Sequence, residues 1–272
     1  KIKVKKKFIA ITFLVLITFG MIGCGKNQVL KKENVNETNQ EQATENKETT
    51  EEQKENTNNN TEEQSQSQID YINIAPEEVK IPILMYHSIS DEDPSNNLLV
   101  PPAMFEEQMA WLEANNFTAM NMDEALEAMR TGKVPKRPVV ITFDDGYANN
   151  YTSAFPSLKN HKLKATFFVI TDGVDNGYYM SSDNLKEMQE AGMSIENHTA
   201  NHLELNNLSK TDAYESIKRA QDYLRNVIGS DGNYLCYPVG KYNDETIQIE
   251  EELGIKAAVT TQGGFASIND GL

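Results

Sequence analysis

Residues 139–146 read Val-Val-Ile-Thr-Phe-Asp-Asp-Gly, an apolar run that ends in two adjacent carboxylates and a glycine. Strands that are buried on both faces of a parallel sheet read as continuous apolar runs of this kind. Asp144 and Asp145 follow the run directly, and α/β folds place ligand-binding residues at the carboxyl ends of strands. Asp-Asp-Gly is also typical of a turn that leads into a helix N-cap. This stretch therefore predicts a buried parallel strand and leaves two interpretations for its carboxylates.

From about residue 77 onward, segments with strand and helix patterns alternate along the chain. Repeated strand–helix units favour an α/β domain with a parallel sheet, either open or closed into a barrel. The second helix is expected to use Asp123, directly after Met122, as its N-cap. The expected strands are Lys80–Tyr86, Val139–Phe143, Ala165–Ile170, Met193–Ile195, Tyr234–Tyr237 and Ala257–Thr260. The expected helices are Met104–Asn115, Asp123–Arg130, Tyr151–Asn160, Ser182–Glu190, Lys210–Val227 and Asp244–Leu253.

Two of the four histidines lie in one short stretch, residues 198–202, which reads His-Thr-Ala-Asn-His. Histidines four apart share one helical face, or both point inward from a tight loop. Two neutral imidazoles and one carboxylate make a three-ligand site with an open position for water, as in catalytic zinc centres. The second aspartate is then free to act as a general base. Solvated or capping histidines are the alternative, but the coincidence with the aspartate pair favours a mononuclear metal hydrolase.

Both stretches carry a resemblance to a known family. Residues 142–146, Thr-Phe-Asp-Asp-Gly, and residues 198–202 resemble the first two motifs of the polysaccharide deacetylases (carbohydrate esterase family four, the NodB-like domain), in the same order and at a similar distance. The resemblance covers about residues 80–270. It implies a distorted (β/α) barrel as a single catalytic domain, one divalent metal ion, usually zinc, and hydrolysis of N-acetyl groups on a hexosamine polymer. By this resemblance the base is Asp144, and the metal ligands are Asp145, His198 and His202.

The third motif departs from the family pattern. The family usually has Arg-Pro-Pro-Tyr-Gly where residues 236–240 read Cys-Tyr-Pro-Val-Gly, so the arginine that usually steadies the catalytic aspartate is absent. The backbone N–H of Val239 can still help to hold the oxyanion, because a main-chain donor does not depend on the side chain. Glu196 stands where the family usually has a small residue, two before the first metal histidine, and is expected to be an extra carboxylate close to the metal without an assigned role. Cys236 has no assigned role either and is expected to be a small buried residue.

The usual acid near the C-terminus is also missing, because no histidine follows His202. Residues 82–87, Pro-Ile-Leu-Met-Tyr-His, are similar to the opening of the poly-N-acetylglucosamine deacetylases, in which an early histidine supplies the acid. The resemblance therefore gives His87 this role, with a hydrogen-bonded histidine at a strand end as the alternative. Tyr147 and Tyr237, beside the motifs, are candidates to stack on sugar rings, or else they pack in the core. His161 lies in a polar turn and is expected on the surface.

These residues predict a metal-dependent N-deacetylase of an extracellular polymer, with poly-N-acetylglucosamine as the expected substrate. A peptidoglycan N-deacetylase is the alternative within the same enzyme class. A lipid-anchored glycan-binding protein with a degenerate site is the alternative from a different class, supported by the altered third motif. All five proposed catalytic and metal positions are filled, which favours activity.

The first 24 residues have the pattern of an export signal. Five lysines lie in residues 1–7, an apolar run follows at residues 8–19, and Cys24 comes directly after a small residue. This ending resembles the lipobox of bacterial lipoproteins, so Cys24 is expected to carry the lipid anchor. The apolar run is shorter than the roughly 20 residues of a full membrane span. We expect the protein at the extracellular face of the bacterial cell membrane, with a signal anchor or secretion as the alternatives.

Residues 25–76 are rich in Asn, Glu, Gln and Thr. Such a segment buries too little apolar surface to offset its ordering entropy, so it predicts a disordered spacer ahead of a catalytic domain at 77–272. The net charge is −16 and becomes more negative when the lysine-rich leader is removed. Nucleic acid is therefore not an expected partner, because its binding depends on phosphate charge. The expected partners are the acetylated polysaccharide and the membrane, and no protein partner can be inferred.

Overall fold

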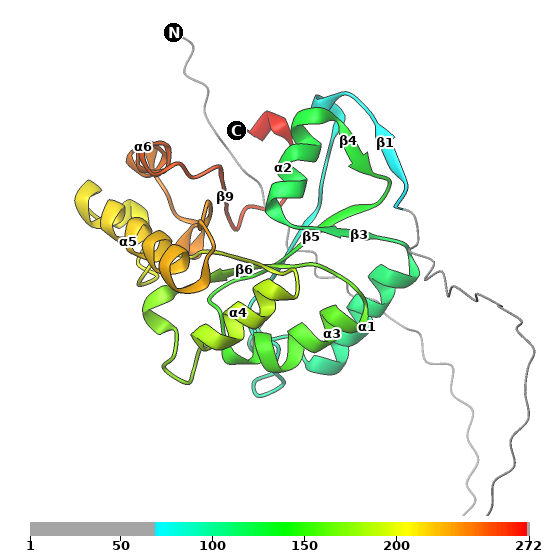
Figure 1. Cartoon of the computed structure of the whole chain (residues 1–272), viewed down its shortest axis with the longest axis horizontal. Helices are drawn as coiled ribbons and strands as arrows, with labels where there is room; N and C mark the ends of the chain where they lie inside the picture. The colour runs from blue at the N-terminus through cyan, green and yellow to red at the C-terminus, as the bar shows by residue number, and fades with distance from the viewer. Residues whose placement is uncertain (1–68, 271–272) are drawn as a thin grey trace, which may run out of the picture. The chain divides into compact units, whose positions relative to one another are not determined.

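Strand β5 (Pro138–Phe143) is the centre of the fold, in agreement with its apolar sequence (Figure 1). The computed structural model describes residues 69–270, and within them β5 pairs with β2, β3 and β6. Alternate side chains enter two different hydrophobic clusters. Val139, Ile141 and Phe143 pack in one cluster, and Val140 packs in the other, on the opposite face. The strand is therefore buried on both faces, as its continuous apolar run predicts.

The main sheet has seven parallel strands in the order β2-β5-β6-β7-β8-β9, with β3 paired to β5. Its curl makes a half-barrel, and among residues 69–270 no strand pairing joins β9 to β2. The α/β prediction of a distorted (β/α) barrel in a single domain is confirmed. Besides β5, the strands are β2 (Ile83–Tyr86), β3 (Thr118–Met120), β6 (Thr166–Val169), β7 (Ser194–Asn197), β8 (Tyr234–Cys236) and β9 (Ala257–Val259).

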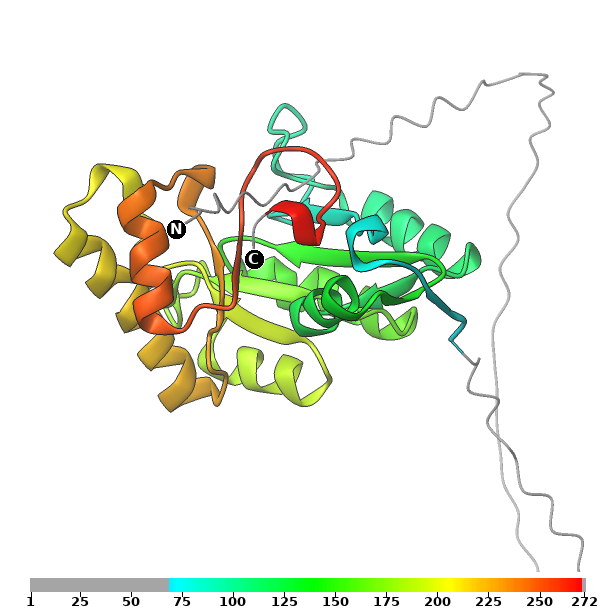
Figure 2. The ribbon, with the colours of Figure 1, turned by 90° about the horizontal axis from the view of Figure 1, so that it is seen from above.

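Helices cover the sheet on both sides (Figures 1 and 2). Helices α1, α3 and α4 lie along one side, where they enclose the cluster that holds Ile141. Helix α2 covers the opposite face, and α5 packs beside α6 near the end of the sheet. The helices are α1 (Pro102–Ala114), α2 (Met122–Thr131), α3 (Phe155–Asn160), α4 (Ser182–Glu190), α5 (Lys210–Tyr223) and α6 (Asp244–Leu253).

Two of the expected helices include a π-helical turn. The helix expected at 151–160 begins as a π turn over Asn150–Ala154 and continues as α3. The helix expected at 210–227 is α5 followed by a π turn over Leu224–Ile228. Single π turns of this kind occur often beside functional sites. The first one directly follows the aspartate motif.

Helix α2 begins with a different cap from the one predicted. The Asn121 side chain accepts a hydrogen bond from the Glu124 N–H at 2.9 Å, and the Glu124 carboxylate accepts one from the Asn121 N–H at 3.0 Å. This reciprocal pair is a capping box. Asp123 is therefore not the N-cap. Its carboxylate instead accepts hydrogen bonds from the Tyr234 hydroxyl and the Lys256 ammonium.

The folded region starts before residue 77, where the sequence placed the domain boundary. Strand β1 (Tyr71–Asn73) pairs antiparallel with β4 (Lys133–Pro135), a ribbon that the sequence did not predict. The Ile74 N–H donates to the Gly132 carbonyl at 3.0 Å. Gly132 has φ +75°, and a Cβ there would lie 2.0 Å from the Ile74 carbonyl oxygen, so only glycine fits. The last residues assigned to the spacer are thus part of the domain.

The predicted signal segment, Cys24 and the rest of the spacer lie outside the described residues. Among residues 69–270, no helix is both long enough and apolar enough to cross a membrane.

His161 is less exposed than a free surface histidine. It follows α3, and its ring nitrogens lie 2.7 Å from a Glu106 carboxylate oxygen and 2.6 Å from one of Glu113. Hydrogen bonds to Glu113 and Glu106 raise the pKa of His161. The residue joins the end of α3 to α1 and takes no part in the site described next.

Candidate active site

The predicted site residues gather at the carboxyl ends of the parallel strands. His87 follows β2, the two aspartates follow β5, His198 follows β7, and Val239 follows β8. Carboxyl ends of parallel strands meet at one edge of a sheet, so residues far apart in sequence become neighbours there.

Asp145, His198 and His202 form a compact group of possible metal ligands. The Asp145 Oδ1 atom lies 3.3 Å from His198 Nε2 and 3.4 Å from His202 Nε2. One ligand atom from each residue lies within 4.8 Å of the others. A carboxylate oxygen with two imidazole nitrogens suits a catalytic divalent ion, because it leaves a coordination position for water. The sequence-predicted ligand set is therefore brought together in the fold.

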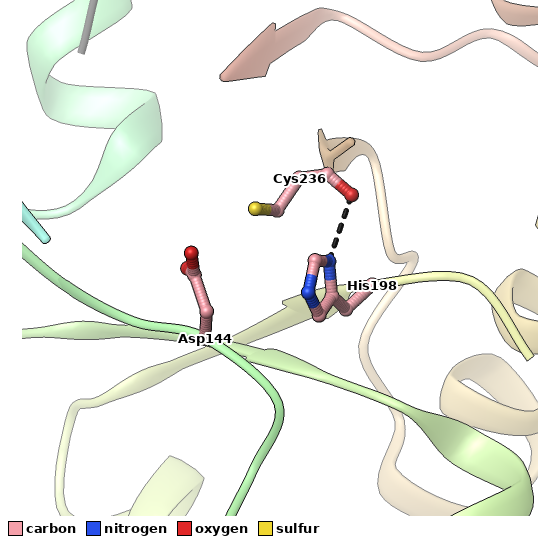
Figure 3. Close-up of side chains that lie close together, drawn as sticks. All are labelled: Asp144, His198 and Cys236. Carbon is pink, nitrogen blue, oxygen red and sulfur yellow. Dashed lines mark hydrogen bonds between the residues drawn. The ribbon is translucent and has the colours of Figure 1, made fainter. Parts of the chain in front are cut away.

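The backbone of Cys236 orients the first of these histidines. His198 Nδ1 donates a hydrogen bond to the Cys236 carbonyl at 2.8 Å (Figure 3). This bond places a proton on Nδ1, so Nε2, which faces Asp145 at 3.3 Å, is the nitrogen that could bind a metal ion. Metal-binding histidines are typically held by such a bond from the other ring nitrogen. The geometry of His198 thus fits a metal ligand.

The charges of the site keep Asp145 ionised. Burial by itself would raise the pKa of Asp145. A hydrogen bond with His198 and the positive charges of His198, His87 and His202 outweigh burial and lower the pKa to about 2. Burial favours the neutral form of His198, but Asp145 and Asp144 outweigh it and raise the pKa of His198. Burial and the neighbouring His198 lower the pKa of His202. A cation bound here would replace the proton that His198 otherwise retains.

The loop that carries the two candidate metal-binding histidines has a strained backbone. The non-glycine residues Asp145, Thr199, His202 and Val239 have positive φ values of 72°, 65°, 55° and 49°. The Thr199 N–H donates to Asn197 Oδ1 at 2.7 Å, and the His202 N–H donates to Thr199 Oγ1 at 3.0 Å. The histidines therefore point inward from a tight loop rather than from a helix. Such strain concentrates at functional sites.

Asp144 and His87 form a second pair beside these possible metal ligands. His87 Nε2 lies 3.8 Å from Asp144 Oδ2, and both side chains are largely buried. The Asn150 amide donates to the His87 carbonyl at 2.7 Å, and the Asn149 amide donates to Ser88 Oγ at 2.7 Å. Sequence reasoning missed both asparagines. Their position shortly after the aspartate motif could have marked them as candidates. It could not show that they contact His87 and Ser88 in the loop after β2.

Tyr147 and Tyr237 have different environments. Tyr147 is half-buried and packs against Tyr178 and Tyr179, with ring centroids 5.4 and 5.5 Å away. Burial, together with the charge and a hydrogen bond of Asp145, raises the pKa of Tyr147. Tyr237 is buried in a hydrophobic cluster, and its ring stacks on Tyr242 at 4.6 Å. The structure therefore places Tyr237 in the core, because both of its ring faces are covered, and leaves Tyr147 as the sugar-stacking candidate.

Glu196 lies away from the metal ligands. Its carboxylate accepts hydrogen bonds from Ser194 Oγ at 2.8 Å and from the Tyr234 N–H at 3.1 Å. It lines a polar pocket with Asp123 and Lys256, at the amino-terminal ends of β7, β8 and β9. Burial raises the pKa of Glu196 to about 7. Despite its place two residues before His198, Glu196 belongs to a different site.

The sequence and the fold are similar to those of known deacetylases. The family model described as polysaccharide deacetylase matches residues 131–258. YxkH of Bacillus subtilis, provisionally named a polysaccharide deacetylase, is 39% identical over 194 residues, which are 71% of this chain and 68% of that protein. The poly-β-1,6-N-acetyl-D-glucosamine N-deacetylase of Staphylococcus epidermidis is 30% identical over 66% of this chain and 71% of its own length.

A solved structure shows the same similarity in three dimensions. The Streptococcus pyogenes deacetylase PplD, determined in complex with acetate, superposes with a TM-score of 0.69 and 36% sequence identity. The match covers 71% of this chain and 89% of that one.

Proposed function

Because this chain belongs to the polysaccharide deacetylase family, we propose that it removes N-acetyl groups from an extracellular polymer, poly-β-1,6-N-acetyl-D-glucosamine. The observation that carries the proposal is the arrangement of two carboxylates and three histidines at one edge of the sheet. A relative named for this substrate is 30% identical over most of the described domain. The early histidine before the aspartate strand is present here as His87.

The proposed cofactor is one zinc ion held by Asp145, His198 and His202. Two imidazoles and a carboxylate are a usual zinc donor set when a position is left open for catalysis. When bound, such an ion polarises the acetyl carbonyl and lowers the pKa of water.

The proposed roles of Asp144 and His87 follow from the family resemblance and from their position beside the possible metal ligands. Asp144 accepts a proton from the attacking water, and His87 donates a proton to the sugar nitrogen as the amide C–N bond breaks. Acetate and a free amine are the products. The backbone N–H of Val239, at the edge of the same site, stabilises the oxyanion. Activity requires an ionised Asp144 and a protonated His87, so it should fall on both sides of a pH optimum.

Three tyrosines beside the metal ligands form the proposed sugar-binding surface. Tyr178 is 65% exposed, and its ring packs edge-on against Tyr147 and Tyr179 at 5.4 and 5.1 Å. Its support by two neighbouring rings fixes its orientation. The apolar face of a pyranose can stack on such a ring, so we propose that Tyr178 binds a sugar of the polymer next to the one being deacetylated.

The proposed location is the outer surface of the cell membrane, with a lipid on Cys24. The lysine-rich start, the apolar run and the cysteine after glycine support this location. The polar segment that follows would give the domain reach toward a polymer outside the cell.

The test is acetate release from β-1,6-linked N-acetylglucosamine oligomers, with peptidoglycan and other acetylated glycans assayed in parallel. We expect release to stop after chelation and to return with zinc. Undiminished release after exhaustive chelation would contradict the metal-dependent mechanism. Turnover of peptidoglycan alone would show that peptidoglycan is the substrate in place of poly-N-acetylglucosamine. Tight glycan binding without metal or turnover would indicate a binding protein.

A further inference from the structure

Three strands bring Asp144, His198 and Cys236 together on the inner face of the half-barrel (Figure 3). One polar atom from each residue lies within 4.8 Å of the others. The exposed fractions of the three residues are only 4%, 2% and 5%. Cys236 stands where the third motif departs from its usual sequence, and the mechanism above uses no part of its side chain.

The Asp144 carboxylate has few hydrogen-bond donors for a buried group. Its Oδ2 atom lies 3.8 Å from His87 Nε2, which is beyond hydrogen-bond distance. Its Oδ1 atom is buried and accepts no hydrogen bond from the described residues as they are placed. Among those residues, His87 is the only basic side chain in an ion pair with it. A buried carboxylate is costly unless nearby donors compensate for lost water.

The Cys236 thiol is a nearby polar group that can donate a hydrogen bond to the Asp144 carboxylate. The sulfur is turned toward the Asp144 carboxylate (Figure 3). The backbone carbonyl of Cys236 accepts the His198 hydrogen bond at 2.8 Å, which fixes the position of the residue. A thiol rotates about a single bond, and its S–H is a weak donor.

We propose that Cys236 is the positioning residue for the base of the proposed deacetylation: its thiol donates a hydrogen bond to the Asp144 carboxylate. The same residue holds His198 through its carbonyl, so one position in β8 orients both the base and a metal ligand. The proposal rests on the proposed function, and it concerns the orientation of Asp144 rather than any new chemical step.

The first test compares Cys236→Ala, Cys236→Ser and Val259→Ala in the full chain. Cys236→Ala removes the donor, and Cys236→Ser keeps one. Val259 pairs with Cys236 in the sheet and is equally buried, so Val259→Ala reports the loss of packing alone.

We expect Cys236→Ala to lower kcat about tenfold to a hundredfold, as for loss of a hydrogen bond to a charged group. The acidic limb of its pH–rate profile should move to higher pH, because Asp144 then loses a donor that favours its ionised form. KM and bound metal should stay unchanged, and Cys236→Ser should recover most of the rate. A wild-type rate and pH profile in Cys236→Ala would overturn the proposal, as would an equal kcat loss in Val259→Ala.

The second test does not depend on turnover. The chain has two cysteines, so Cys24→Ser leaves Cys236 as the only thiol, and its S–H stretch can be followed by infrared spectroscopy. We expect Asp144→Ala in this background to move the band to higher frequency, because the acceptor is lost. An unchanged band would overturn the contact. If the wild-type protein releases no acetate, the proposed function fails while this spectrum still tests the hydrogen bond.

Discussion

Two buried carboxylates of the same sheet region, Asp145 and Glu196, have opposite surroundings. Asp145, at the carboxyl end of β5, faces two imidazoles at 3.3 and 3.4 Å. Glu196, the third residue of β7, faces the neutral donors Ser194 Oγ and the Tyr234 N–H. The pKa of Asp145 falls to about 2, whereas that of Glu196 rises to about 7.

The difference shows what turns a buried carboxylate into a candidate metal ligand. Both groups are desolvated, and desolvation alone favours the protonated acid. At Asp145 the nearby histidines compensate strongly enough to keep the carboxylate ionised, and two of them add the nitrogen ligands that a divalent ion needs. Glu196 lies two residues from His198 in sequence, yet strand geometry gives it different neighbours. The predictions below test this contrast.

The largest effect is expected from Asp145→Ala. Loss of the carboxylate leaves two imidazoles, which cannot hold a catalytic ion as tightly, so bound metal and acetate release should both fall by roughly a thousandfold or more. Metal content by mass spectrometry and initial rates measure the two quantities. Full metal occupancy in Asp145→Ala would show that the ion is bound by other residues.

Asp144→Asn should distinguish the role of a catalytic base from that of a metal ligand. The side chain keeps its size but can no longer accept a proton, so kcat should drop about a hundredfold to ten-thousandfold. Bound metal should remain near one ion per chain. If metal and activity disappear together, Asp144 is a ligand, and the division of roles between the two aspartates is wrong.

His87→Gln tests the acid. We expect a kcat loss of about a hundredfold or more, because the leaving amine is no longer protonated. The alkaline limb of the pH–rate profile should disappear, since that limb reports deprotonation of the acid. His161→Gln is the matched control, because His161 is held between two glutamates away from the site. An alkaline limb that persists in His87→Gln would assign the acid to another group.

Tyr178→Ala should have a smaller effect that depends on substrate length. Loss of one stacking ring should raise KM for long oligomers about threefold to tenfold, with little change for a single N-acetylglucosamine unit. Trp111→Ala removes another exposed aromatic ring on helix α1 and serves as the control. The same KM increase at every chain length would exclude a separate binding position for a neighbouring sugar.

Glu196→Gln should leave activity intact and change only the pH dependence of stability. The folded-state pKa of Glu196, about 7, lies above its ordinary value, so its protonated form stabilises the fold below the ordinary pKa. That contribution is lost as the pH rises through 7. Unfolding in denaturant should therefore show a decline in wild-type stability from about pH 5 to pH 8, and a flatter curve for Glu196→Gln. A large loss of kcat would instead place Glu196 in the active site.

Much of the fold could be predicted from local patterns. The run at 139–143 predicted the central strand because it is apolar on both faces, and most helices lie within a few residues of their expected positions. The short strands β1, β3 and β4 were missed. Three residues carry too little pattern, and pairing with a distant partner decides whether they become strands. Asp123 was expected as the cap of α2, although Asn121 followed three residues later by Glu124 is the sequence pattern of the capping box that the structure shows.

The candidate site was also partly predictable. Residue type and spacing identified the aspartate pair and the two histidines, because few other roles need those groups together. Tyr237 packs in the core, the alternative to sugar stacking that the sequence left open, because adjacency to a motif does not show which face of a strand a side chain takes. Asn149 and Asn150 were missed because their partners lie some 60 residues away, in the loop after β2.

The sequence by itself determined the class of fold and the chemical groups of the site, because strand periodicity and ligand chemistry are local properties. Tertiary structure alone decided which contacts and which ionisation state each of those groups has. Strand pairing set Asp145 against two histidines, turned Glu196 toward neutral donors, and brought the Cys236 thiol to Asp144. The physical reason is that a pKa, a ligand geometry and a hydrogen bond depend on atoms a few ångströms away, and only the folded chain decides which atoms those are.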